Sequence, residues 1–127
     1  MKNYLLVIFL AASLLGACRS LPAVQTLENR TVTPVRGTLQ EAILAGGAKK
    51  GWSMYAVHPG LIRGELALRG HEVKVNIPYT EHTYSIRYAD SVNMKYNAKK
   101  NKIHGKYNQW VRNLDLAIHQ AAAGDMR

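Results

Sequence analysis

Three residues of the sequence would bind a metal ion or transfer protons if the fold brought their side chains together. His58 lies in a predicted turn, and Glu81 and His82 lie in a second predicted turn two strands later. Alternate turns of an antiparallel meander lie at the same end of the sheet, so the two turns should meet. The spacings match no zinc motif such as HExxH or CxxC. Polar turn residues are the more ordinary explanation of all three, so we predict neither a metal nor a cofactor. If the protein does bind a metal ion, His58, Glu81 and His82 are the candidate ligands.

The arrangements that covalent or acid–base catalysis requires are missing from the sequence. It has no GxSxG nucleophile elbow, and its single cysteine, Cys18, lies at the end of an apolar N-terminal run. Paired-carboxylate chemistry needs two acids about 5–10 Å apart. Glu41 fits a helix cap, while Glu65 and Glu72 fit outward strand positions, so the sequence offers no such pair. We therefore predict that the protein is not an enzyme.

A basic stretch towards the C-terminus is the best candidate for a binding surface. The candidate anionic-ligand patch consists of Lys95, Lys99, Lys100, Lys102 and Lys106, with His104 beside them. Tyr96 and Tyr107 interrupt the lysines, and cations with aromatic neighbours suit phosphates or sugar rings. The alternative is a solvated loop with Tyr107 in the hydrophobic core. We prefer that alternative for Tyr107 and leave both interpretations open for the lysines.

The N-terminus has the three zones of an export signal. Lys2 provides a positive start, and residues 5–15 form an uncharged apolar run, shorter than the roughly 20 residues that span a bilayer. Leu15-Gly16-Ala17-Cys18 resembles the lipobox of bacterial lipoproteins. The resemblance implies that residues 1–17 are a signal peptide and that Cys18 is lipidated. An Asp directly after the lipidated cysteine would hold such a protein in the inner membrane, so Arg19 at this position favours the outer membrane. Several acyl chains give stable anchoring.

The mature chain is predicted to contain one domain on a tether. Residues 18–36 comprise the lipidated cysteine and a flexible linker with Pro22, Pro34 and no periodicity. Residues 37–124 form a compact domain. Helices are predicted from Thr38, which begins a capping box, to about Gly51, and from about Gly105 to Ala123. Gly46 and Gly47 weaken the first helix unless close packing against a sheet requires small residues.

Between the helices, the apolar residues alternate with a period of two. Four strands are predicted, at Trp52–Val57, Leu61–Arg69, Val73–Ile77 and Tyr84–Tyr88. Short connections favour an antiparallel four-stranded meander. The predicted fold is therefore α+β, in the order α-β-β-β-β-α, with both helices on one sheet face and with Trp52 and Trp110 anchoring the core. The other face should expose Arg63, Glu65, Arg69, Glu72, Lys74 and Arg87.

Residues 38–118 resemble a family of small, uncharacterised Gram-negative lipoproteins. The resemblance rests on Gly51-Trp52, Pro59-Gly60, Arg69 with His71, Ile77 with Tyr79, Tyr84-Ser85-Ile86 with Tyr88, Asp90-Ser91, Ile103-His104, Tyr107-Asn108 and Trp110. These positions are core and turn positions, for which packing is a sufficient explanation. The resemblance implies the fold and an envelope location, and it carries over no catalytic residue.

Charge and location together define the expected function. The 127 residues contain 17 Lys and Arg against 8 Asp and Glu, a formal net charge of +9, which attracts anionic partners but also serves solubility. We predict a non-catalytic envelope lipoprotein, outer-membrane anchored and facing the periplasm, that binds an envelope protein or an anionic lipid or polysaccharide. Nucleic acid is not expected as a partner. The alternative is an envelope metal-binding protein or hydrolase that uses His58, Glu81 and His82.

Overall fold

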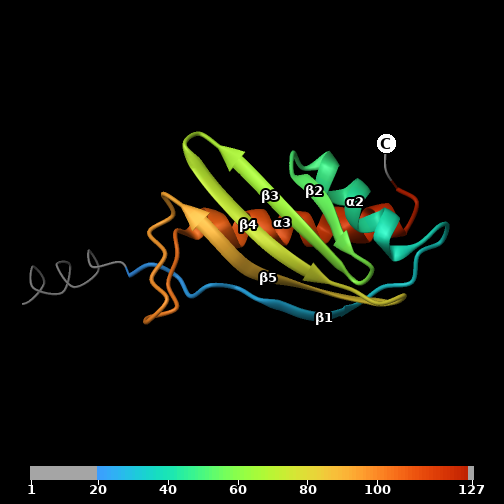
Figure 1. Cartoon of the computed structure of the whole chain (residues 1–127), viewed down its shortest axis with the longest axis horizontal. Coiled ribbons are helices and arrows are strands. Elements are labelled where there is room, and N and C mark those ends of the chain that lie inside the picture. The colour runs from blue at the N-terminus through green and yellow to red at the C-terminus, as the bar shows by residue number, and fades with distance from the viewer. Residues whose placement is uncertain (1–19, 126–127) are drawn as a thin grey trace, which may run out of the picture.

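The computed structural model describes residues 20–125, so the predicted signal peptide and Cys18 lie outside the described residues. Figure 1 shows a sheet with two helices behind it. The elements are β1 (Leu27–Thr31), α2 (Leu39–Lys49), β2 (Ser53–His58), β3 (Leu61–Leu68), β4 (His71–Pro78), β5 (Thr83–Val92) and α3 (Gly105–Ala122). The α+β class is thus confirmed.

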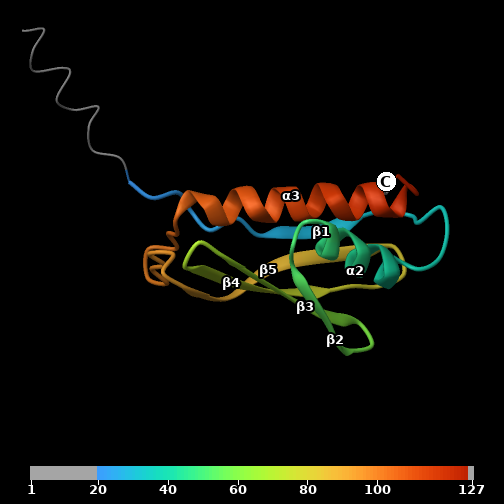
Figure 2. The same ribbon diagram turned by 90° about the horizontal axis from the view of Figure 1, so that it is seen from above.

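The sheet has five antiparallel strands in the order β1-β5-β4-β3-β2. The four predicted strands form the expected meander from β2 to β5. The predicted number of strands was wrong, because β1 adds a fifth strand along the free edge of β5. Figure 2 shows α3 lying along one side of this twisted sheet.

Strand β1 lies in the segment that was predicted to be a flexible tether. Residues 20–36 instead lie along the domain: the amide of Val24 donates to the carbonyl of Asn101, and that of Val35 donates to the carbonyl of Ala122. The register of β1 shifts between Leu27 and Arg30, and Asn29 has a positive φ of 51°. A short edge strand interrupted by a bulge has no period-two alternation, which is why the sequence pattern concealed it.

The core lies between one face of the sheet and both helices. Alternate residues of the three inner strands, including Ile62, Val75 and Ile86, are fully buried against Ile43 of α2 and Leu114 of α3. Trp52 is buried as predicted. Within residues 20–125, the buried core side chains lie between residues 39 and 122, so residues 19–127 contain the core of the described part and can be studied without the N-terminal run.

The two helices approach each other closely at Gly46. A Cβ atom on Gly46 would lie 2.7 Å from the backbone nitrogen of Ile118 in α3. Close packing was the condition under which small residues would be required here, and at Gly46 the close neighbour is the backbone of α3 rather than the sheet. Gly47 faces the side chain of Met54 in β2. The capping box is confirmed in part: the Thr38 hydroxyl accepts a hydrogen bond from the amide of Glu41.

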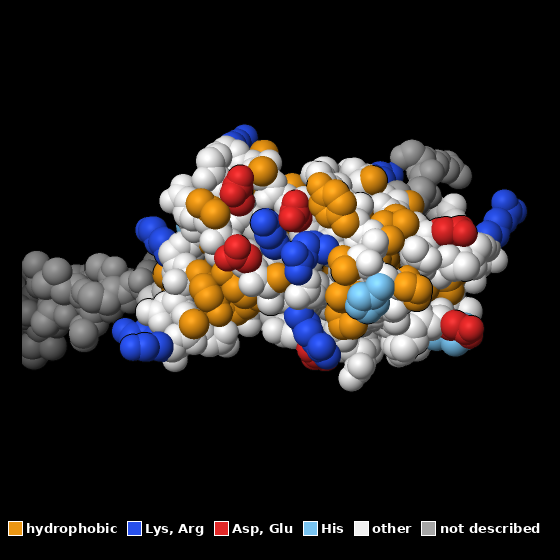
Figure 3. Space-filling model, viewed as in Figure 1, with side chains coloured by type: hydrophobic (Ala, Val, Ile, Leu, Met, Phe, Trp, Pro, Cys, Tyr) orange, Lys and Arg blue, Asp and Glu red, His pale blue; other side chains and the backbone are white. Residues whose placement is uncertain are grey.

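The other face of the sheet is mixed in charge. Figure 3 shows basic and acidic side chains interspersed there with apolar ones. The Lys74 ammonium lies 3.6 Å from the Glu65 carboxylate, and Arg87 pairs with Glu28 at 2.8 Å. The Glu28 pKa is lowered, mainly by its hydrogen bond from Arg87. Opposite charges that neutralise each other do not favour one sign of ligand, so this face fits an ordinary solvated surface.

Candidate functional site

The predicted lysine patch lies on an acid-free stretch at one end of the molecule. No Asp or Glu occurs from residue 91 to residue 114, which contain Lys95, Lys99, Lys100, Lys102, Lys106 and Arg112. The stretch leaves β5, makes a loop and enters α3. We call Arg69, Lys95, Lys99, Lys100, Lys102 and Lys106 the basic end, because the β3–β4 turn that contains Arg69 packs beside this loop.

The lysine loop, residues 93–104 between β5 and α3, has a defined backbone structure. Asn97 and Lys102 exchange backbone hydrogen bonds of 2.8 and 3.1 Å, and the Asn97 side chain accepts from the amide of Lys100 at 3.0 Å. Lys95, Lys99, Lys100 and Lys106 are exposed, and Lys102 is half-buried. The ordered loop therefore presents several ammonium groups outward without a carboxylate from its own segment.

The N-terminal segment meets the domain at this loop. The amide of Ile103 donates to the carbonyl of Pro22 at 3.1 Å, and Ala23 forms an isolated β-bridge with Lys102. Both views show the beginning of the described chain beside the lysine loop (Figures 1 and 2). Cys18 precedes Ser20 by two residues, and two residues of chain span at most about 7 Å. The described chain thus begins beside the basic end.

Side-chain bonds hold the N-terminal segment against α3. The Asn108 side chain accepts from the amide of Gln25 and donates to the carbonyl of Ala23, both at 2.9 Å. Arg30 forms a two-pronged pair with Asp115, with nitrogen–oxygen distances of 3.1 and 2.9 Å. This pair raises the pKa of Arg30. The same carboxylate accepts a hydrogen bond from the Tyr84 hydroxyl, whose pKa is raised chiefly by burial.

A pocket of about 220 Å³ lies between the β3–β4 turn and the start of α3. It is lined by Leu68, Arg69, His71, His104, Lys106 and Trp110. The His71 ring centroid lies 5.6 Å from that of His104 and 6.4 Å from that of Trp110. Trp110 is half-buried and packs against the core, so the prediction of a core anchor holds only in part. The pocket combines two cations, two imidazoles and an indole.

The hydrogen bonds of the two imidazoles fix opposite tautomers. The His71 Nδ1 lies 2.7 Å from the carbonyl oxygen of Asn93, which can only accept, so Nδ1 carries the proton. The His104 Nδ1 accepts a hydrogen bond of 3.1 Å from the backbone N–H of Lys106 and so caps α3. Because Nδ1 is the acceptor, the neutral His104 ring has its proton on Nε2. The pocket therefore contains one imidazole acceptor, His71 Nε2, and one donor, His104 Nε2–H. A metal ion would find only one free imidazole lone pair here.

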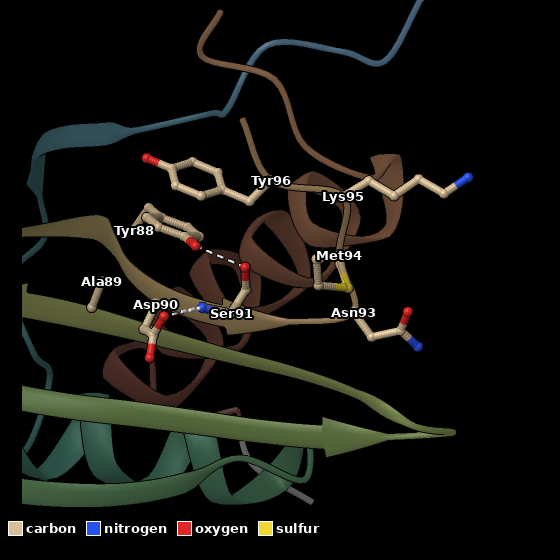
Figure 4. Close-up of a pocket in the computed structure, with 8 residues that line it drawn as sticks. All are labelled: Tyr88, Ala89, Asp90, Ser91, Asn93, Met94, Lys95 and Tyr96. Atoms are coloured by element: carbon tan, nitrogen blue, oxygen red, sulfur yellow. Dashed lines mark hydrogen bonds between the residues drawn. The ribbon is translucent and has the colours of Figure 1, made fainter. Parts of the chain in front are cut away.

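A larger and more open pocket of about 660 Å³ adjoins the loop. Figure 4 shows Tyr96 above Tyr88, with Lys95 pointing away from the other labelled side chains. The two phenol rings are stacked with centroids 4.1 Å apart, and the Tyr88 hydroxyl bonds to that of Ser91 at 2.7 Å. All lining residues come from the single segment 88–96, which includes Asp90. An acidic lining residue and a lysine directed elsewhere make this pocket a poor site for anions.

The two turns that carry His58, Glu81 and His82 do lie side by side. The amide of Tyr79 donates to the carbonyl of Gly60 at 2.9 Å. His82 and Glu81 are 4.0 Å apart, whereas the His58 ring bonds to the carbonyl of Pro59. Within residues 20–125, no group of three or more His, Cys, Asp or Glu side chains is placed to hold a metal ion. The turns meet as predicted, but the three side chains do not form a metal site.

Sequence reasoning found the lysines but missed the pocket beside them. The signal was present: Arg69 with His71, and His104 with Trp110, belong to the residues that carry the family resemblance. They were interpreted as turn and core positions because 33 residues separate His71 from His104 in the chain, and only the packing of the β3–β4 turn against α3 brings them together.

No helix within residues 20–125 is both long and apolar enough to cross a membrane. The chain matches no protein-family model, no curated protein and no solved structure.

Proposed function

We propose that the protein is a non-catalytic envelope lipoprotein, lipidated at Cys18 and anchored in the outer membrane on the periplasmic side, that binds an anionic envelope component through its basic end. The observation that carries this proposal is the bonding of residues 22–24 to residues 101–103. A lipid on Cys18 would hold the lysine loop at the membrane surface. Each lysine near an anionic membrane contributes about 1 kcal/mol of attraction.

The anchor is tested with the full chain in Gram-negative cells that are supplied with radioactive palmitate. We expect the wild-type protein to incorporate label and to fractionate with outer membranes. Cys18→Ser should remove the label and leave an uncleaved precursor. Both proteins are expressed at the same level, so that a difference in label reflects residue 18. Equal labelling of wild type and Cys18→Ser would refute the lipoprotein proposal.

The basic end is tested with residues 19–127, because this part lacks the lipid and contains the core of the described part. We expect it to bind vesicles of phosphatidylglycerol and phosphatidylcholine in low salt and to release them in high salt. Changing Lys95, Lys99, Lys100 and Lys102 to Gln should weaken binding at least about tenfold, because about two lysines' attraction already exceeds that factor. Sedimentation of the vesicles measures the bound fraction.

A matched pair of double variants separates position from total charge. Lys99→Gln with Lys100→Gln removes two charges from the lysine loop, whereas Arg36→Gln with Lys50→Gln removes two exposed charges near the termini of α2. We expect only the loop variant to lose affinity strongly. If both double variants lose affinity equally, net charge alone explains binding and the basic end is not a site.

A further inference from the structure

We infer that the pocket between the β3–β4 turn and α3 binds a sugar phosphate, with the phosphate held by Arg69, Lys106 and His104 and the sugar ring lying against Trp110. This inference deepens the proposed function, since it names the chemistry of an anionic ligand, but it concerns a pocket distinct from the lysine loop. Six residues from two separate segments of the chain, 68–71 and 104–110, line the pocket.

The phosphate is indicated by donors that converge without an acid among them. The lining of the pocket includes the guanidinium of Arg69 and the ammonium of Lys106, and neither residue is buried. His104 adds an N–H donor that the helix cap fixes at Nε2. A planar guanidinium and an ammonium on opposite elements suit a dianionic group with several acceptor oxygens. No Asp or Glu contributes to the lining.

The sugar is indicated by the remaining groups of the pocket. Trp110 offers part of an indole surface, and Leu68, which is 45% exposed, offers an apolar side chain next to it. His71 contributes the acceptor Nε2, because its Nδ1 proton is engaged by the carbonyl of Asn93. Inorganic phosphate would leave the acceptor and the apolar surfaces unused, whereas a hydroxylated ring uses both.

The backbone at Arg69 supports a role for its side chain. Arg69 and Gly70 form the two-residue connection between β3 and β4, with φ values of 54° and 81°. A turn with two positive φ values favours Asn-Gly or Gly-Gly, and a left-handed conformation costs a residue such as arginine about 1–2 kcal/mol. Asn93, which bonds to the carbonyl of Gly70, is also left-handed, with a φ of 60°. Strained residues of this kind cluster at ligand sites.

The test uses residues 19–127 and glucose 6-phosphate as the probe, followed by NMR of the two indole N–H groups. We expect the Trp110 signal to shift on titration while that of Trp52, buried in the core, stays fixed. Glucose alone should produce no shift, and inorganic phosphate should bind about tenfold more weakly. Absence of a Trp110 shift with glucose 6-phosphate would overturn the inference.

The variants are chosen to keep the fold intact. Asparagine tolerates the left-handed conformation of the turn, so Arg69→Asn should keep it. Lys106→Gln retains the backbone N–H that donates a hydrogen bond to His104. Together they should weaken binding of glucose 6-phosphate at least about tenfold, the equivalent of about 1.4 kcal/mol. Arg36→Gln with Lys50→Gln removes the same charge outside the pocket and outside the basic end, and should leave the affinity unchanged. Equal losses in both double variants would overturn the site.

A second arm distinguishes a soluble sugar phosphate from one on a lipid. Phosphatidylcholine vesicles with lipid A, a phosphorylated glycolipid, are added to the protein bound to glucose 6-phosphate. Displacement of the probe supports a lipid-borne ligand, and retention supports a soluble one. Neither arm depends on Cys18, because residues 19–127 do not contain it, so failure of the pocket and failure of the proposed anchor are recognised separately.

Discussion

Replacing Gly46 by alanine is expected to destabilise the domain by about 2 kcal/mol or more, even though alanine favours helices by about 1 kcal/mol over glycine. The new methyl group would lie 2.7 Å from the backbone nitrogen of Ile118 and 2.9 Å from the carbonyl carbon of Ala117. Backbone atoms within a helix cannot swing aside, so α2 and α3 would have to separate. Urea unfolding of residues 19–127, followed by circular dichroism, measures the change.

The neighbouring glycine provides the control. A methyl group on Gly47 would meet the end of the Met54 side chain, which is flexible and can rotate away. Gly47→Ala should therefore stay within about 1 kcal/mol of the wild-type stability, because the gain in helix propensity offsets the rearrangement. Equal unfolding midpoints for the two variants would show that α2 does not approach α3 as closely as described.

Replacing Asp115 by alanine is expected to lower the free energy of unfolding by about 3 kcal/mol. The Asp115 side chain is only 14% exposed, and it accepts hydrogen bonds from the Arg30 guanidinium and the Tyr84 hydroxyl. Its removal leaves a cation and a buried hydroxyl without this shared acceptor. The loss should be greatest at β1, so hydrogen exchange of the Arg30 and Val32 amides, which face β5, should accelerate more than exchange in β3.

Two further variants separate charge from hydrogen bonding at this position. Asp115→Asn retains an acceptor for Tyr84 but loses the charge that pairs with Arg30, so it should be less damaging than Asp115→Ala. Glu28→Gln weakens the exposed pair with Arg87 on the same edge of the sheet and should cost less than either. If Glu28→Gln were as destabilising as Asp115→Ala, the half-buried network would not be the main attachment of β1.

The elements that could be predicted from the sequence are those in which the spacing of apolar residues follows the pattern of burial. The stripe of α3 and the alternation in β3 and β4 place Val111, Leu114, Ile62 and Val75 in the core. Strand β1 has no such pattern, since its attachment depends on polar side chains such as Arg30 whose partner is 85 residues away. Propensity and periodicity are local, and a polar pair between distant segments leaves no local pattern.

The candidate site was likewise predictable from the sequence only where its residues are neighbours in the chain. The lysines lie within one short stretch, so their clustering is visible in the sequence. The pocket needs Arg69 on a hairpin turn and Lys106 on a helix to be brought together, and the helix cap decides the tautomer of His104. Three-dimensional packing therefore had to be known before the donor and acceptor pattern of the pocket became apparent.

The attachment of β1 to β5 and α3 also has a consequence for the order of folding. During synthesis or export the N-terminal segment leads, yet its partners come last: Gln25 bonds to a residue 83 positions later, and Arg30 to one 85 positions later. Contacts of such high sequence separation form after local hairpins and helices, because the intervening chain must first be closed into a loop. Residues 20–31 thus remain an undocked leader while the meander assembles. If Cys18 is lipidated as we propose, the enzyme that modifies it acts on this open chain, before β1 docks.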